Sequence, residues 1–207
     1  MSNVEVFGFE NENIRGNVWE KYKAKKGVVD RLGIIFSDPK VLFAGNKVHF
    51  KDRFFLCKGG YCCDILGPSK YRIGSVIIKY TTDKLGNIKQ PFDYTLFPWM
   101  FSEQTYTKLK TLNVDFSVAT HDIKIGCTNE DYQHIDITPC QESIWQSKAE
   151  LRAKILEEAK PIWDYIKRGI ASDLSVEEIK DLLGGTPTAG GADPSTKLDL
   201  DSVLSQV

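Results

Sequence analysis

The stretch from His49 to Cys63, HFKDRFFLCKGGYCC, constrains the fold of this chain more than any other, because it concentrates metal-binding side chains. It contains one of the three histidines and three of the five cysteines: His49, Cys57, Cys62 and Cys63. Thiolate and imidazole groups are ligands that Zn²⁺ prefers, and a site with four protein ligands is typically structural. The sequence therefore predicts one structural zinc ion in a small insert over residues 47–66.

The ligand spacing, H-x7-C-x4-C-C, differs from the two separated pairs of a common zinc motif. Adjacent residues of an extended chain point to opposite sides, so Cys62 and Cys63 can share one ion only if the chain turns there. Gly59 and Gly60 are suited to such a turn. The alternative is that these cysteines are buried thiols without a metal, because free cysteine often packs as a small hydrophobic residue.

Composition favours a folded protein of a reducing compartment. Hydrophobic residues make up 42% of the 207 residues, enough for one domain with a core and appendages. The start of the chain lacks the basic and apolar regions of a secretory signal, and no apolar run is long enough to cross a bilayer. Five cysteines, two of them adjacent, make a poor disulfide framework. We therefore expect a cytoplasmic protein.

The net charge of −1 conceals two halves of opposite sign. Residues 19–92 hold 15 Lys and Arg against 6 Asp and Glu, whereas residues 93–207 hold 11 against 19. A basic half beside an acidic half is typical of nucleic-acid-binding proteins with an acidic appendage.

Hydrophobic patterning predicts short antiparallel strands in the first two thirds of the chain. Runs rich in β-branched residues indicate strands over 28–36 and 71–80, and 92–97 is the expected partner of the second. The segment 40–50 reads as a hairpin that turns at Gly45-Asn46. Many short strands separated by turn signals favour a small barrel or sandwich.

Helices are expected after Ser102 and throughout the region that follows residue 146. Ser102 is a suitable helix N-cap. Ser147 with Glu150 and Ser175 with Glu178 have the spacing of capping boxes. The predicted class is therefore α+β, mainly β with C-terminal helices.

These patterns divide the chain into four regions. Residues 1–18 form an N-terminal arm, and 19–146 form a β-rich core that includes the zinc-binding insert 47–66. Residues 147–184 form the C-terminal helices. Residues 185–207 form a Gly- and Pro-rich flexible linker with an acidic tail.

The basic half carries the two kinds of group that single-stranded nucleic acid requires. Cations bind the phosphates, and exposed rings stack on bases, each stack contributing about 1–3 kcal/mol. For any single aromatic residue, a place in the hydrophobic core is the alternative. The predicted contact residues are Trp19, Tyr22, Lys23, Lys25, Lys26, Arg31, Lys58, Tyr61, Tyr71, Arg72, Lys79 and Tyr80.

Signatures of catalysis are lacking in the sequence. It contains no dinucleotide or phosphate-binding glycine loop and no nucleophile elbow. A thiol hydrolase would need Cys127 or Cys140 beside His121 or His134, and no spacing selects such a pair. We predict that the chain is not an enzyme.

In the order of its segments the chain resembles the single-stranded-DNA-binding (helix-destabilising) proteins of T-even phages, from about Tyr22 to the end. The resemblance implies an OB-like antiparallel barrel with a zinc-binding subdomain and cooperative coating of single-stranded DNA. It also implies an acidic tail that recruits replication and recombination proteins. For a phage protein, the resemblance implies that it acts in the cytoplasm of the host cell. It is carried by YKAKKGVVDRLGIIF, by the ligand set His49, Cys57, Cys62 and Cys63, and by PWMFSEQTYTKL, DIKIGCTNEDYQHIDIT and LDLDSVLSQV.

The expected function is sequence-tolerant binding of single-stranded DNA in replication, recombination and repair. The alternating aliphatic and acidic tail would dock on partner proteins, unless it is a tail without a partner. The alternative function is a zinc-containing adaptor that binds proteins and no DNA. The tail residues expected to contact a partner are Leu198, Asp199, Leu200, Asp201, Val203 and Leu204.

Overall fold

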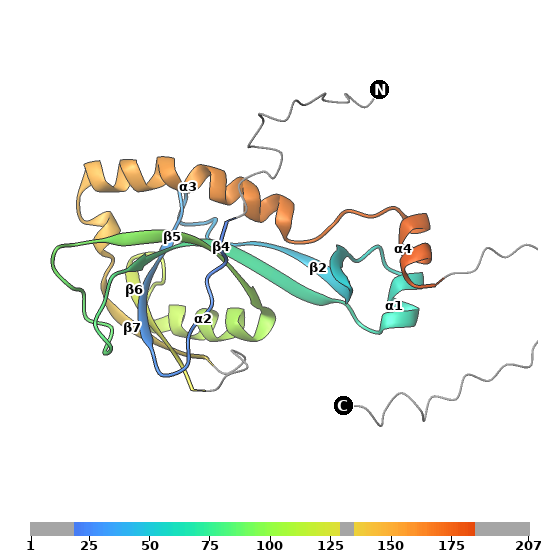
Figure 1. The fold of residues 1–207 in the computed structure, drawn as a ribbon, viewed down its shortest axis with the longest axis horizontal. Coiled ribbons are helices and arrows are strands. Elements are labelled where there is room, and N and C mark those ends of the chain that lie inside the picture. The colour runs from blue at the N-terminus through green and yellow to red at the C-terminus, as the bar shows by residue number, and fades with distance from the viewer. Residues whose placement is uncertain (1–18, 129–134, 185–207) are drawn as a thin grey trace, which may run out of the picture.

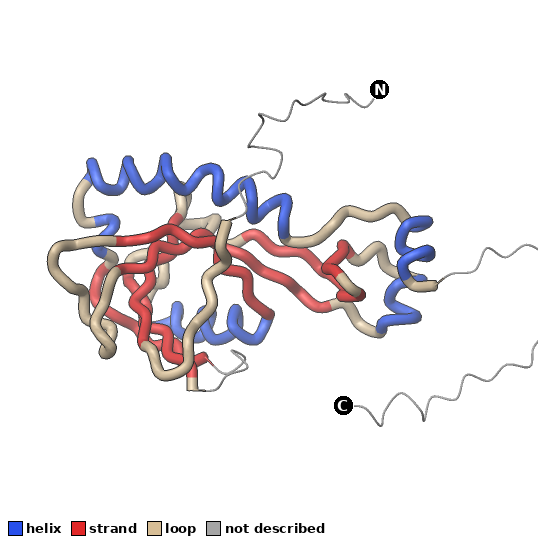
Figure 2. Tube along the Cα trace, in the orientation of Figure 1, coloured by secondary structure: helices blue, strands red, loops and turns tan. Residues whose placement is uncertain are grey.

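The computed structural model describes residues 19–128 and 135–184, so the predicted N-terminal arm and the acidic tail lie outside the described residues (Figures 1 and 2). Strands dominate the first part and helices the second, as the sequence predicts. The elements are β1 (Val29–Ile35), β2 (Ala44–Lys51), β3 (Arg53–Leu56), α1 (Tyr61–Leu66), β4 (Lys70–Tyr80), β5 (Tyr94–Ser102), α2 (Glu103–Asp115), β6 (His121–Cys127), β7 (Ile135–Glu142), the 3-10 turn η1 (Ile144–Gln146), α3 (Ala149–Gly169) and α4 (Val176–Leu182).

One antiparallel sheet is organised around β4, the longest strand. Strand β5 pairs along one edge of β4, and β2 and β1 pair in succession along the other, with Ala44 opposite Gly74 and Ile35 opposite Val76. The order β3-β2-β4-β1-β6-β7 completes the sheet, with β5 branching from β4. The predicted α+β class with a mainly antiparallel sheet is confirmed.

The sheet is not closed, so the expected barrel is not found in the described residues. Between β5 and β6 the segment before β1 makes only isolated backbone bonds, from the N–H of Tyr22 to the oxygen of Pro98 and from Gly27 to Cys127. In an antiparallel strand the N–H and C=O of one residue face the same edge. Pro98 therefore has no donor on this edge, and the ladder cannot continue there.

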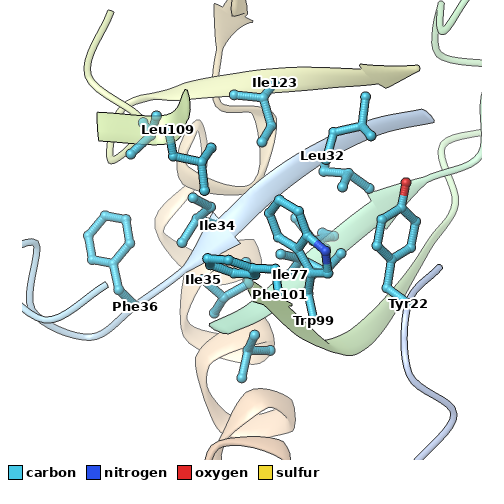
Figure 3. Close-up of a cluster of buried hydrophobic side chains, with 14 of the residues drawn as sticks. Tyr22, Leu32, Ile34, Ile35, Phe36, Ile77, Trp99, Phe101, Leu109 and Ile123 are labelled. Atoms are coloured by element: carbon cyan, nitrogen blue, oxygen red, sulfur yellow. The ribbon is translucent and has the colours of Figure 1, made fainter. Parts of the chain in front are cut away.

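Helices cover both faces of the sheet (Figure 1). Helix α3 packs on β4 and β5 through Ile155, Ala159, Ile162 and Ile166, a spacing that places all four on one helix face. Helix α2 lies against the other face. There the core gathers Leu32, Ile34, Ile77, Trp99, Phe101, Leu109 and Ile123 (Figure 3).

The closest approach of α3 to the sheet occurs at Gly74. A Cβ atom there would lie 2.7 Å from both Ile166 Cγ2 and Met100 Sδ. We expect Gly74→Ala to destabilise the protein by about 1–3 kcal/mol, because the core has to shift to admit the methyl group. Chemical denaturation measures this loss.

A matched control for that substitution is Gly126→Ala on β6, where a Cβ would have no neighbour within 4 Å. The control should leave the free energy of unfolding nearly unchanged or raise it slightly. Equal stabilities of the two variants would contradict the tight contact at Gly74.

A second, smaller core lies at the end of the sheet that carries α1 and α4 (Figure 1). It consists of Phe55, Cys62, Leu174 and Ile179, all buried. Residues 170–175 join it to β3, because Ser172 exchanges backbone hydrogen bonds with Phe54 and Leu56 at 2.9 and 3.0 Å. We call β2, β3, α1 and residues 170–184 the distal module. Helix α4 thus packs on the predicted zinc insert, whereas α3 packs on the main sheet.

The helix caps agree only in part with the sequence predictions. The capping box of Ser175 and Glu178 at α4 is confirmed. The box at Ser147 is wrong, because α3 begins at Ala149 and the Ser147 hydroxyl donates to the oxygen of Ile144. Among the described helices none is long and apolar enough to cross a membrane.

Candidate metal centre and nucleic-acid-binding surface

The four predicted ligand residues meet in the distal module. One ligand atom from each of His49, Cys57, Cys62 and Cys63 lies within 4.8 Å of every other, so the group could hold a metal ion. The prediction that these residues form one cluster is confirmed. His49 comes from β2, Cys57 follows β3, and the other two stand on α1.

Local backbone geometry explains how adjacent cysteines point into one site. Gly59 and Gly60 adopt positive φ angles of 73° and 47°, which glycine reaches without strain. Helix α1 begins directly after them. On a helix, consecutive side chains diverge by about 100° rather than by the half turn of a strand, so Cys62 and Cys63 can both reach the cluster.

The sulfur atoms are close together. Cys57 Sγ lies 3.3 Å from Cys63 Sγ and 3.9 Å from Cys62 Sγ, and Cys63 Sγ lies 3.5 Å from Nε2 of His49. His49 and Cys62 are buried, and the His49 ring packs against Phe55 with ring centroids 5.8 Å apart. This contact restrains the His49 ring within the cluster.

The thiols do not ionise independently. Desolvation opposes ionisation of Cys57, but hydrogen bonds from the Gly59 N–H and from Cys63, Ser69 and His49 bring its pKa down to about 6. The hydrogen bond to Cys57, with desolvation and the charge of that thiolate, raises the pKa of Cys63 to about 11. Ionisation of one of these thiols therefore opposes ionisation of the other, and binding of a cation would release their protons.

Three of the predicted DNA contacts lie in the core, so the prediction of a surface role is wrong for them. Tyr22 packs edge-on against Trp99 (Figure 3), and its hydroxyl donates to Asp30 at 2.9 Å. Tyr80 is completely buried, and Arg31 forms an ion pair with Asp122. Both faces of β1 and of residues 73–80 of β4 are covered, so a residue of either stretch is buried or half-buried whichever way it points. The two tyrosine hydroxyls and the Arg31 guanidinium find buried carboxylates as partners.

The basic segment, which we define as residues 19–26, remains on the surface. Tyr22 and Ala24 point inward and anchor it, whereas Lys21, Lys23, Lys25 and Lys26 are exposed. Burial lowers the pKa of Lys21, and the charges of Arg72 and Lys23 lower it further. Among the described residues, no acidic side chain pairs with Lys21, Lys23 or Lys25. Trp19 is half-buried at the start of the segment.

Tyr71 and Arg72 are adjacent on β4 and face opposite sides of the strand, so the ring and the guanidinium do not share a face. Tyr71 is 43% exposed and contacts Lys47, whose Nζ lies 5.7 Å from the ring centroid. The Arg72 guanidinium lies over the Phe54 ring instead. Lys47 was not among the predicted contact residues, because only its place on a predicted strand distinguishes it in the sequence.

The other predicted cations and rings already have partners. Lys79 forms an ion pair with buried Asp30 at 2.7 Å, and Lys58 pairs with Asp173. Tyr61 contacts Lys180 of α4. The two ion pairs reduce the positive charge that Lys58 and Lys79 can offer to a ligand, and the Tyr61 ring already has a cation beside it.

A hollow of about 370 Å³ opens where β4 ends. Lys79, Lys84 and Lys89 line it, together with Phe97. Lys84 and Lys89 were not among the predicted contact residues. Their place around the turn between β4 and β5 could have indicated that they are exposed. The hollow adds two exposed cations to the basic half of the protein.

Two cysteines, Cys127 and Cys140, lie outside the candidate metal cluster. Cys127 is buried in the core. The ring of His121 contacts Phe116 edge-on, and its Nδ1 lies 3.0 Å from the Thr120 hydroxyl. Such local contacts are typical of a structural histidine. His134, the other predicted base, lies outside the described residues.

Comparison with family models, with curated proteins and with solved structures finds no match to this chain. The resemblance to the T-even phage proteins gains no support from these comparisons and stays a prediction.

Proposed function

We propose that this protein binds single-stranded nucleic acid, preferably DNA, with little sequence preference. One observation carries the proposal: the basic segment displays Lys21, Lys23 and Lys25 without acidic partners among the described residues, close to Arg72. Burial is the main cause of the lowered pKa of Lys21, and the charges of Arg72 and Lys23 lower it further, so these cations repel one another. A chain of phosphates would relieve this repulsion and release its own counterions.

We further propose that the metal is zinc and that its role is structural. In a tetrahedral site with Zn–S bonds of about 2.3 Å, neighbouring sulfur atoms lie about 3.8 Å apart. The distances of 3.3 and 3.9 Å between the sulfur atoms lie near this value. Four protein ligands leave no open position for substrate, which supports a structural ion rather than a catalytic one.

In this proposal the protein acts without catalysis in DNA replication, recombination and repair. It coats and protects exposed single strands, and the tail residues 198–204 recruit partner proteins. The tail belongs to the proposal through its sequence alone, in which aliphatic residues alternate with Asp199 and Asp201.

An adaptor that binds proteins and no DNA is the second candidate. The observation that favours it is the apolar surface of the distal module, where Ile65 is 49% and Val176 44% exposed. Exposed aliphatic groups of this kind occur at protein interfaces. Binding of oligonucleotides at moderate salt separates the two candidates.

Titration of a fluorescent oligo-dT tests the main proposal. Lys21, Lys23, Lys25 and Arg72 would contact about four phosphates, which predicts a slope near −2.8 in a plot of log affinity against log salt. Affinity should therefore fall about 50-fold between 50 and 200 mM salt. The matching duplex should bind far more weakly.

Two charge-removing variants sharpen this experiment. Lys23→Gln with Lys25→Gln should make the slope shallower by about 1.4. The control, Lys154→Gln with Lys160→Gln, removes two exposed cations of α3 that have acidic neighbours, and should leave the slope unchanged. A salt-independent affinity, or equal affinity for duplex, would refute the proposal.

A further inference from the structure

The tip of the β2–β3 hairpin presents a pair of phenylalanine rings. Phe50 and Phe54 are direct partners across the two strands, and their ring centroids lie 4.9 Å apart. The chain reverses at Asp52, whose φ angle is 58°, between the paired residues Lys51 and Arg53. Phe50 is 61% exposed although a ring of this size gains free energy from burial.

Arg72 holds the inner ring of this pair. Its guanidinium lies 3.9 Å from the Phe54 ring centroid and donates a hydrogen bond of 2.8 Å to the oxygen of Ile170. The guanidinium, Phe54 and Phe50 thus form a continuous group on one face of the sheet. The outer member, Phe50, is the one left exposed to solvent.

Arg72 contacts the Phe54 ring, and its charge also acts on Lys21 of the basic segment. Exposed Lys70 pairs with Val48 on the same face of the sheet as the rings, and exposed Lys51 and Arg53 are their neighbours at the hairpin tip. An apolar protein partner would remove water from these cations without offering them a negative charge, which is unfavourable. An unpaired nucleic-acid strand would place phosphates on the cations and a base on the ring. The surrounding charge therefore favours a nucleotide as the occupant.

We infer that Phe50, supported by Phe54 and Arg72, is a stacking site for one unpaired base of a strand whose phosphates follow the basic segment. This inference rests on the proposed function and assigns to it a residue pair that the sequence reasoning did not select. A base within a duplex has no free face to offer, so the site would contribute to discrimination between single and double strands.

The test compares oligo-dT with an abasic oligonucleotide of the same length, which keeps the phosphates and lacks the bases. Phe50→Ala should weaken oligo-dT binding about 10-fold and leave abasic binding unchanged. Phe50→Tyr should retain the affinity, and Phe50→Leu, which keeps apolar area without a ring, should not. The control is Phe116→Ala, which removes another exposed phenylalanine, 43% exposed at the end of α2.

The outcomes separate this inference from the proposed function. If Phe50→Ala lowered the affinity for both oligonucleotides equally, or for neither, the stacking site would be overturned. The proposed function would still stand if Lys23→Gln with Lys25→Gln weakened both ligands. Unchanged oligo-dT affinity together with lost self-association in sedimentation would assign the rings to a second copy of this chain. Failure of the unmodified protein to bind either oligonucleotide would refute the proposed function itself.

Discussion

Removal of the metal ion that we propose for the cluster is expected to unfold the distal module while the main sheet stays folded. The second core has only four buried hydrophobic residues, Phe55, Cys62, Leu174 and Ile179, whereas Val48 and Ile170 of the module belong to the main core. Four residues are too few to stabilise a fold of this size alone. Structural zinc contributes roughly 10–16 kcal/mol of apparent binding free energy in small zinc domains. Most of the stability of the module would therefore come from the ion.

Hydrogen exchange locates this effect. The amides of Leu56, Cys57 and Ser172, which bond to Ser172, Lys47 and Phe54 respectively, should lose protection when a strong chelator is added. Amides of β1 and of residues 76–79 of β4, which pair with each other, should keep their protection, because they belong to the main core. Helix α4 should unfold together with α1, although more than a hundred residues separate them in sequence.

Single substitutions distinguish a metal site from packed thiols. Cys57→Ser should be as damaging as Cys62→Ser if both ligate an ion, although Cys57 is only half-buried. Packed thiols without a metal predict instead that the buried Cys62 matters and Cys57 does not. Cys140→Ser, outside the module and also half-buried, is the matched control. Purified protein without about one equivalent of zinc would contradict the identity of the ion.

The metal ligands were predictable because their residue types are rare in this chain and lie close together in sequence. The main strands were predictable for a similar reason, since their apolar patterns are local. The structure places β1 at Val29–Ile35 and β4 at Lys70–Tyr80, close to the expected ranges. Strand β5 pairs with β4 as expected and continues to Ser102.

Long-range pairing explains the hairpin that the sequence placed wrongly. Strand β2 runs straight through Gly45 and Asn46, because Ala44–Val48 pairs residue by residue with β4. The reversal occurs later, at Asp52. The pairing with β4 outweighs the local turn preference of a Gly-Asn pair, and no short window of sequence contains that information.

The same limit applies to the candidate binding surface. The lysines of the basic segment and their exposure follow from alternation with Tyr22 and Ala24. The burial of Arg31 does not, because its partner Asp122 lies 91 residues away. The docking of α4 on the zinc insert depends on a contact between Ile179 and the module core, which has no local signal either.

Loss of the buried carboxylate of Asp122 is expected to cost about 3–5 kcal/mol of unfolding free energy. Asp122 is completely buried and accepts hydrogen bonds from Arg31 Nε at 2.9 Å, Ser143 Oγ at 2.7 Å and the Tyr80 hydroxyl at 3.1 Å. Asp122→Ala would leave the Arg31 charge buried without a partner, and an uncompensated buried charge is expensive. Urea denaturation near pH 7 measures the loss.

Removal of both charges should restore most of this stability. Burial raises the pKa of Asp122 in spite of the opposing hydrogen bonds from Ser143 and Arg31, so desolvation outweighs their attraction. The folded protein therefore binds this proton more tightly than the unfolded chain does, and ionisation of Asp122 as the pH rises opposes folding. Arg31→Met with Asp122→Leu avoids that cost and should unfold within about 2 kcal/mol of the original protein.

The double variant also tests the corrected role of Arg31. Because its guanidinium is buried, oligo-dT affinity should stay the same when the pair becomes apolar. The stability control is Asp164→Ala on α3, whose side chain is 64% exposed and pairs with Lys167, and which should change stability by less than about 1 kcal/mol. Similar small losses for Asp122→Ala and Asp164→Ala would show that the buried pair is not desolvated. A fall in oligo-dT affinity for the folded double variant would return Arg31 to the binding surface.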